Sequence, residues 1–175
     1  ETDLIPDDKV RRDTWEANEW KSFVRRVRDW LNTTASGDQD FVWDAFVSYQ
    51  MLFFLANSGM RIGELVKVRN KDIQFRKPQI EHPFKKLSAL VQVHPSTKTG
   101  AREVNAMGGE FAKRVQDHSK FKRLDDFLFC HLDGSQFTTK QFNKWFKKMI
   151  EFTDENKRWG KKFVPYSLRH FYATT

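Results

Sequence analysis

The sequence contains a single cysteine, Cys130, among its 175 residues. One thiol excludes an internal disulfide and is typical of a reducing compartment, so we expect a cytoplasmic protein. No apolar run is long enough to cross a bilayer and no signal peptide is recognisable, which argues against a membrane protein. The five histidines and the cysteine show no metal-ligand spacing, so we expect no metal and no other cofactor.

Apolar bulk is not lacking, although the mean hydropathy is only -0.71. Seventeen phenylalanines and six tryptophans can form a sizeable core. We therefore expect a folded chain and not an intrinsically disordered one. The length fits one domain, or one domain with a small appendage. We interpret residues 1–13 as a linker or lead-in and residues 14–175 as the domain. The first residue is Glu1 rather than methionine, so we expect an excised piece of a longer protein.

The charge is distributed unevenly along the chain. Residues 1–48 carry seven Lys/Arg and eleven Asp/Glu, a balance of −4, whereas residues 49–175 have a balance of +12. This asymmetry indicates a polyanionic partner for the second part, although a solvated basic face is a common alternative.

The strongest local pattern lies between Tyr49 and Val68. An apolar run ends at Asn57-Ser58-Gly59, which is a strong helix stop. Arg61 follows at once, before a second short helix, so its guanidinium is held at the junction of two packed helices. A planar, permanently charged fork held in this way suits a phosphate. An ordinary ion pair with Glu64, one helical turn further on, is an equal alternative.

The remaining periodicity predicts a mainly α fold with a small antiparallel β-sheet. Thr14 is the expected N-cap of the first helix, and Asp154 to Lys162 is expected to be a basic loop. The expected helices cover about 14–32, 40–58, 110–122, 140–152 and 167 to the chain end. The expected strands cover 73–75, 90–93 and 102–105, with a loop over residues 77–83 and a turn over residues 96–100.

Three further segments carry candidate binding groups. Lys98 lies in the Thr97-Lys98-Thr99-Gly100 turn, and the pair Arg169-His170 lies on the last helix. Taken alone, Lys98 is an exposed turn lysine and His170 a structural histidine, while Phe171 and Tyr172 are expected in the core. A row of lysines on one helix is a solvated face or a set of phosphate contacts. These are Lys140, Lys144, Lys147 and Lys148.

Taken together and in this order, the segments resemble the catalytic domain of the tyrosine recombinases, the phage integrase family. GMRIGELVKVRNKDI around Arg61 looks like the first box, and SLRHFYAT around Arg169 looks like the second. TKTGAREV is similar to the hairpin that carries the catalytic lysine, here Lys98. The resemblance runs from about Thr14 to Thr175. It implies a site-specific DNA recombinase or integrase of a phage or mobile element. It also implies double-stranded DNA as the partner and a homo-tetramer on DNA in the full-length protein.

The chemistry that the resemblance implies agrees with these residue types. A tyrosine attacks a DNA phosphodiester and forms a 3′-phosphotyrosyl link, which places negative charge on the non-bridging oxygens. Arg61 and Arg169 would hold that charge, and Lys98 would give a proton to the leaving 5′-oxygen. Glu64 would orient Arg61 or hold the late helix in register, and His170 would support the site. No metal is required.

The sequence departs from the family pattern at Tyr166, where members usually have histidine. A tyrosine hydroxyl donates a hydrogen bond but is a poor proton acceptor at neutral pH, so we expect Tyr166 to orient the phosphate. The alternative is that Tyr166 packs against Trp159 or Phe163. The nucleophile is expected beyond Thr175, so this piece alone should bind DNA without completing cleavage. We also expect this piece to lack the N-terminal DNA-clamping domain that family members commonly carry.

Two other functions remain open. The first is a non-catalytic DNA-binding protein that kept the fold and lost the nucleophile. The second is a topoisomerase-like strand-nicking enzyme, which shares the chemistry and differs in target specificity. A His-or-Trp box followed by a tyrosine after Thr175 would favour the recombinase over the non-catalytic protein.

Overall fold

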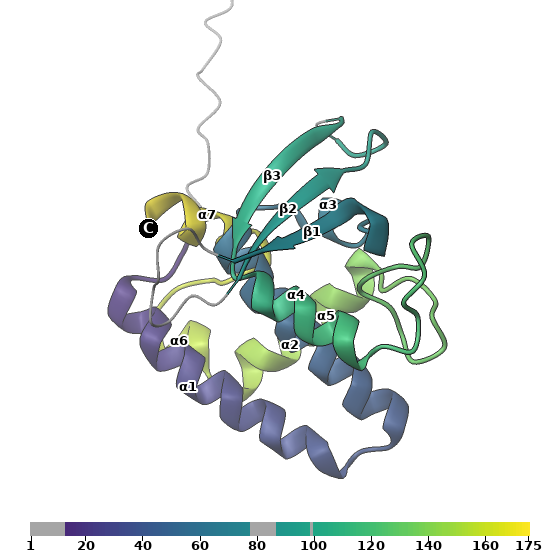
Figure 1. The fold of residues 1–175 in the computed structure, drawn as a ribbon. Helices are drawn as coiled ribbons and strands as arrows, with labels where there is room; N and C mark the ends of the chain where they lie inside the picture. The colour runs from purple at the N-terminus through teal and green to yellow at the C-terminus, as the bar shows by residue number, and fades with distance from the viewer. Residues whose placement is uncertain (1–12, 78–86, 99) are drawn as a thin grey trace, which may run out of the picture.

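The computed structural model describes residues 13–77, 87–98 and 100–175. Its helices pack as one body, and a three-stranded antiparallel sheet lies along one side of that body (Figure 1). This confirms the predicted mainly α fold with a small antiparallel sheet. The helices are α1 (Ala17–Thr33), η1 (Thr34–Ser36), α2 (Gln39–Ser58), α3 (Ile62–Leu65), η2 (Asn70–Asp72), α4 (Gly109–His118), α5 (Thr139–Phe152), α6 (Glu155–Trp159) and α7 (Tyr166–Thr174). The strands are β1 (Ile73–Arg76), β2 (Ser88–Val93) and β3 (Arg102–Met107).

Helix α2 is the centre of the fold. Asp38 caps its start, since the Asp38 side chain accepts a hydrogen bond from the Phe41 N–H at 2.9 Å. Its apolar residues point in nearly every direction because α1, α4, α5, α7 and β3 all contact it. The helix ends where the sequence predicted, at Gly59, whose φ of 66° is the left-handed conformation that glycine adopts most easily.

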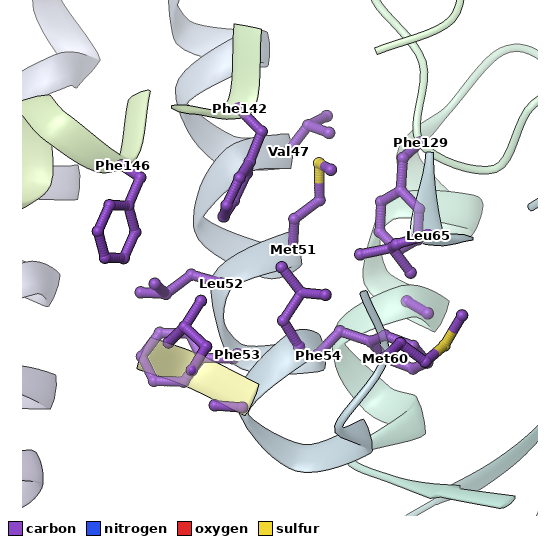
Figure 2. Close-up of a cluster of buried hydrophobic side chains, with 14 of the residues drawn as sticks. Val47, Met51, Leu52, Phe53, Phe54, Met60, Leu65, Phe129, Phe142 and Phe146 are labelled. Atoms are coloured by element: carbon purple, nitrogen blue, oxygen red, sulfur yellow. The ribbon is translucent and has the colours of Figure 1, made fainter. Parts of the chain in front are cut away.

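The core around α2 consists mainly of phenylalanine, methionine and leucine side chains. In Figure 2, Met51, Leu52 and Phe54 project from α2 toward neighbours on other elements. Phe142 and Phe146 reach this cluster from α5, and Leu65 and Phe129 close it from the side of α3. Close packing of large apolar side chains fixes the position of the segment that follows Gly59.

The sheet has the order β1-β2-β3, and both strand pairs are antiparallel. Val91 lies opposite Ile73 on one side and opposite Val104 on the other, so apolar residues face the helices across all three strands. The predicted strands are confirmed, each one or two residues longer than expected. Most of the loop expected over residues 77–83 lies outside the described residues, as does nearly all of the lead-in.

The predicted N-cap at Thr14 is wrong. Helix α1 starts three residues later, and Glu16 occupies the N-cap position, where its backbone N–H donates to the Glu19 carboxylate at 2.9 Å. The Thr14 hydroxyl instead donates to the backbone carbonyl of Ser167 at 3.0 Å. Thr14 therefore connects the start of the domain to α7.

The segment from Asp154 to Lys162 is not a loop throughout, because α6 forms inside it. Asp154 has a φ of 53°, and Glu155 is fully buried. The Glu155 carboxylate accepts hydrogen bonds from Trp15 at 3.1 Å, from Trp159 at 2.8 Å and from Arg26 at 2.7 Å. Two of these partners lie more than 120 residues away in sequence, so no local pattern predicts this helix.

Two smaller expectations also need correction. The helix predicted over residues 110–122 ends at His118, where the Ser119 backbone turns to an extended conformation. Tyr172 is not a core residue, since it is 41% exposed, whereas its neighbour Phe171 is buried. Tyr172 lies close against Gly59, where an added Cβ would stand 2.3 Å from its ring.

Candidate active site

Four separated segments enclose a cavity of about 620 Å³. They contribute residues between Leu55 and Lys67, the turn Ser96–Lys98, two residues of α5, and residues between Val164 and Arg169. Four cationic side chains lie in the described part of its wall: Arg61, Lys67, Lys98 and Arg169. Glu64 is the single carboxylate in that part of the wall. We call this site the basic cavity.

Arg61 lies between the end of α2 and the start of α3, as the sequence predicted. Its φ and ψ of −77° and 145° are extended, so the chain changes direction here between two helices. Its neighbours Met60 and Leu65 are buried in the core. The Arg61 N–H donates to the Glu64 carboxylate at 2.8 Å, which fixes the first turn of α3.

Arg169 reaches the same cavity from α7. The start of this helix is held by Ser167, which is fully buried and whose hydroxyl accepts a hydrogen bond from the Val164 N–H at 3.1 Å. Leu168 is also buried, so the helix cannot rotate without disturbing the core. The Nη1 atom of Arg169 is buried and has no hydrogen-bond partner among the described residues. A buried donor of this kind is stabilised by an anionic ligand.

Lys98 lies in the turn between β2 and β3, where it is exposed. The turn is ordered by hydrogen bonds from the Thr97 N–H to the His94 carbonyl at 3.1 Å and from the Gly100 N–H to the Thr97 carbonyl at 2.9 Å. The Nζ atom of Lys67 donates to the Ser96 hydroxyl at 2.9 Å. Lys67 was not identified from the sequence, because a lysine at the end of a helix carries no local signal of its position.

Glu64 has a partner that the sequence did not reveal. Its carboxylate, only 1% exposed, accepts from Arg102 Nε at 3.0 Å and from Arg102 Nη2 at 2.7 Å. This bidentate contact raises the pKa of Arg102 above its usual value. Sequence reasoning assigned Glu64 to Arg61 or to the late helix. The structure joins Glu64 to the Arg61 backbone and to β3.

Tyr166 lines the basic cavity beside Arg169 and is 40% exposed. Its ring meets the His170 ring edge-to-face, with the centroids 5.1 Å apart. Of the two packing partners considered for it, Trp159 donates to Glu155 at 2.8 Å and Phe163 stacks on Trp15 at 4.3 Å. His170 is not among the described residues that line the cavity.

The lysine row of α5 is exposed, but none of its members belongs to the described wall of the cavity. Thr139 and Asn143, on the neighbouring face of the helix, do line it. Lys147 lies 3.9 Å from Glu151, and Lys148 lies over the ring of Trp145 at 4.5 Å. The row is therefore not uniform, because Lys148 is directed toward an aromatic surface.

The described residues contain no group of three or more His, Cys, Asp or Glu side chains arranged to hold a metal ion. Among the helices they form, none combines the length and the apolar character that a membrane span needs.

Comparison with known proteins places this chain in a family. The model of the phage integrase family matches residues 27–175. No curated protein matches the chain.

Solved structures of recombinases share the fold. The XerH site-specific recombinase bound to difH substrate has a TM-score of 0.61 and 17% identity over 92% of this chain and 41% of its own. The Tn1549 transposon integrase in complex with transposon right end DNA has a TM-score of 0.60 and 19% identity over 98% of this chain and 55% of its own. A lambda integrase dimer bound to a COC′ core site has a TM-score of 0.57 and 14% identity over 94% of this chain and 41% of its own.

This chain thus spans about half the length of these structures or less. The family match covers most of the sequence, from the middle of α1 to the last residue, and includes all four cations of the basic cavity. The chain has the catalytic-domain fold of the tyrosine recombinases and belongs to the phage integrase family.

Proposed function

We propose that this chain is the catalytic domain of a site-specific DNA recombinase that cleaves and rejoins double-stranded DNA through a 3′-phosphotyrosyl intermediate. One observation carries the proposal. Arg61, Lys98 and Arg169 come from three separate segments and line one cavity, in which a guanidinium nitrogen of Arg169 is buried without a partner among the described residues.

The proposed reaction assigns one task to each of these groups. A tyrosine Oη attacks the phosphorus, a P–Oη bond forms, and the P–O5′ bond breaks. Arg61 and Arg169 bind the non-bridging oxygens, where negative charge increases in the transition state. The Lys98 ammonium transfers its proton to the leaving O5′. The tyrosine proton passes to water or to a residue beyond Thr175.

The nucleophilic tyrosine is proposed to lie after Thr175 in the longer protein. Tyr166 and Tyr172 belong to the same helix as Arg169. Tyr172 lies inside the second box and Tyr166 directly before it, so neither has the position of the family nucleophile. Tyr166 is proposed to orient the phosphate through its hydroxyl, in support of which it lines the basic cavity beside Arg169. Glu64 and His170 are proposed to support the site.

DNA contacts outside the cavity are proposed for the lysine row of α5. Lys140, Lys144 and Lys147 project from the exposed side of this helix, next to the face from which Asn143 reaches the cavity. Lys148 is the weakest member, because its ammonium lies over Trp145. We further propose that the full-length protein acts as a tetramer on DNA.

The test can be run before the recombination site is identified. A protein that carries this chain with its following segment is incubated with a pool of random-sequence duplexes and then denatured in detergent. The expected result is a protein–DNA adduct that survives denaturation and whose DNA shares one sequence. Arg61→Ala and Arg169→Ala should abolish the adduct and keep the fold.

The control for this test is Lys113→Ala, which should keep the adduct, because Lys113 pairs with Asp117 on α4 at 2.8 Å and belongs neither to the described cavity wall nor to the lysine row. Binding of the duplexes without any adduct would overturn the recombinase and favour the non-catalytic DNA-binding protein. An adduct whose DNA shares no sequence would favour the strand-nicking enzyme.

A further inference from the structure

The buried carboxylate of Glu64 connects two parts of the cavity wall that are far apart in sequence. It accepts the Arg61 backbone N–H at 2.8 Å, so it belongs to the segment that carries the first arginine. It also accepts both donors of the Arg102 fork, at 2.7 and 3.0 Å. Arg102 is the first residue of β3, four positions after Lys98.

A second contact holds the other side of the same turn. Lys67 Nζ, three residues after Glu64, donates to the hydroxyl and the carbonyl of Ser96 at 2.9 and 3.3 Å. Ser96 precedes Lys98 by two residues and Arg102 follows it by four, so both ends of the turn are tied to the segment that begins at Arg61. The Lys67 contact is exposed, whereas the carboxylate of the Arg102 contact is buried.

These ties matter for Lys98 because its side chain is exposed. The hydrogen bonds inside the turn fix its local shape, but they do not fix the distance between the turn and Arg61. The Arg102 fork does so through two parallel hydrogen bonds, which restrain both distance and orientation.

We propose that Arg102 is a positioning residue, which acts through Glu64 to hold Lys98 over the phosphate that Arg61 binds. The role rests on the proposed function. It predicts that loss of Arg102 mainly slows one step, the transfer of the Lys98 proton to the leaving 5′-oxygen.

A DNA substrate that needs no proton at this step separates positioning from general structural support. In the duplex recovered as an adduct, the bridging 5′-oxygen at the cleaved bond is replaced by sulfur. A thiol has a reference pKa of about 8.5, so the sulfur leaves as a thiolate without a proton donor. The rate of adduct formation is measured on the oxygen and sulfur duplexes for the wild type, Lys98→Ala and Arg102→Gln.

We expect both variants to be slower on the oxygen duplex by about 10²-fold or more, and to return to within about threefold of the wild type on the sulfur duplex. Equal slowing of Arg102→Gln on both duplexes would overturn the positioning role, since it would indicate general structural damage. Unchanged rates on both would overturn it as well. A wild type that forms no adduct with either duplex would overturn the proposed function itself.

Two further variants complete the experiment. Glu103→Ala is the matched control, because Glu103 is the next residue on β3 and its exposed carboxylate accepts a hydrogen bond from the Gln92 side chain at 2.7 Å, away from Glu64. It should behave as the wild type on both duplexes. Lys67→Met removes the exposed tie without touching a buried charge, so it tests the turn even if Arg102→Gln does not fold. Lys67→Met should slow adduct formation on the oxygen duplex only, by a smaller factor than Arg102→Gln. Equal slowing on both duplexes would count against the proposal.

Discussion

The core around α2 and the wall of the basic cavity lie on either side of the same short segment, and their interactions are of different kinds. On the core side, Phe54, Met60 and Leu65 are almost fully buried among other apolar side chains. On the cavity side, Arg61, Lys67 and Arg169 place like charges around one space. Burial of apolar surface stabilises the fold, whereas clustered cations oppose it. We infer that stability resides in the core and that the cavity is maintained for binding.

Truncation of a core aromatic residue should have the largest effect on stability. Phe54 and Phe142 are both fully buried. Phe54→Ala or Phe142→Ala should lower the free energy of unfolding by about 3–5 kcal/mol, because each removes a ring and leaves a cavity. Urea denaturation followed by circular dichroism measures this change. Phe152→Ala is the control, since Phe152 is 49% exposed, and a comparable loss in that variant would contradict the assignment of the core.

The buried carboxylate of Glu64 is the exception on the cavity side, because it contributes to stability as well as to the site. Glu64→Gln should lower the free energy of unfolding by about 2 kcal/mol, since it weakens hydrogen bonds to Arg102 and to the Arg61 backbone. The effect is kept below that of a fully buried pair because the Arg102 side chain is 36% exposed and solvent can reach it. The same urea titration applies, and a change indistinguishable from zero would remove Glu64 from the structural framework.

Of the two glycines that flank Arg61, Gly59 lies on the packed side of the segment and Gly63 lies on the cavity side. Gly59 has a φ of 66°, and an added Cβ would lie 2.3 Å from the Tyr172 ring, so Gly59→Ala should cost about 1–2 kcal/mol. Gly63 lies inside α3 and lines the cavity, with nothing within 4 Å of an added Cβ. Gly63→Ala should therefore be neutral or stabilise by up to about 1 kcal/mol. Thermal melts of the pair measure the contrast, and equal destabilisation would contradict it.

The smallest expected effect is a difference in alkylation rate between the buried thiol of Cys130 and a thiol introduced at the cavity. Burial raises the pKa of this thiol above its usual value, and only the thiolate reacts with an alkylating reagent. Cys130 should thus resist iodoacetamide at neutral pH in the folded protein and react once the chain is unfolded. A second thiol placed at the cavity by Asn143→Cys should react in the folded state, because Asn143 is exposed. Mass spectrometry measures the rate of alkylation at each of the two sites. Rapid labelling of Cys130 in the folded protein would contradict its burial.

The features predicted from the sequence are those that rest on neighbouring residues. The end of α2 at Gly59 follows from one glycine, and the strands follow from short alternating segments. The position of Arg61 follows from the two apolar runs beside it. The meeting of Arg61, Lys98 and Arg169 was expected from a resemblance to a family and not from spacing.

The features that were missed depend on contacts between distant segments. Helix α6 forms because Glu155 is satisfied by Trp15 and Arg26, far away in sequence. Arg102 was overlooked for the same reason, since its partner Glu64 lies 38 residues earlier. Periodicity and turn signals describe local conformation, and they do not show which buried charge will meet which donor.

The salt dependence of DNA binding tests most directly whether Arg61 and Arg169 share one phosphate. The dissociation constant of this chain for a random-sequence duplex is measured between low and physiological salt, for the wild type and for Arg61→Ala combined with Arg169→Ala. We predict weaker binding by the double variant and a plot of log affinity against log salt whose slope is less steep by about 0.9, the value for one phosphate. A slope and an affinity equal to those of the wild type would contradict a phosphate site in the basic cavity.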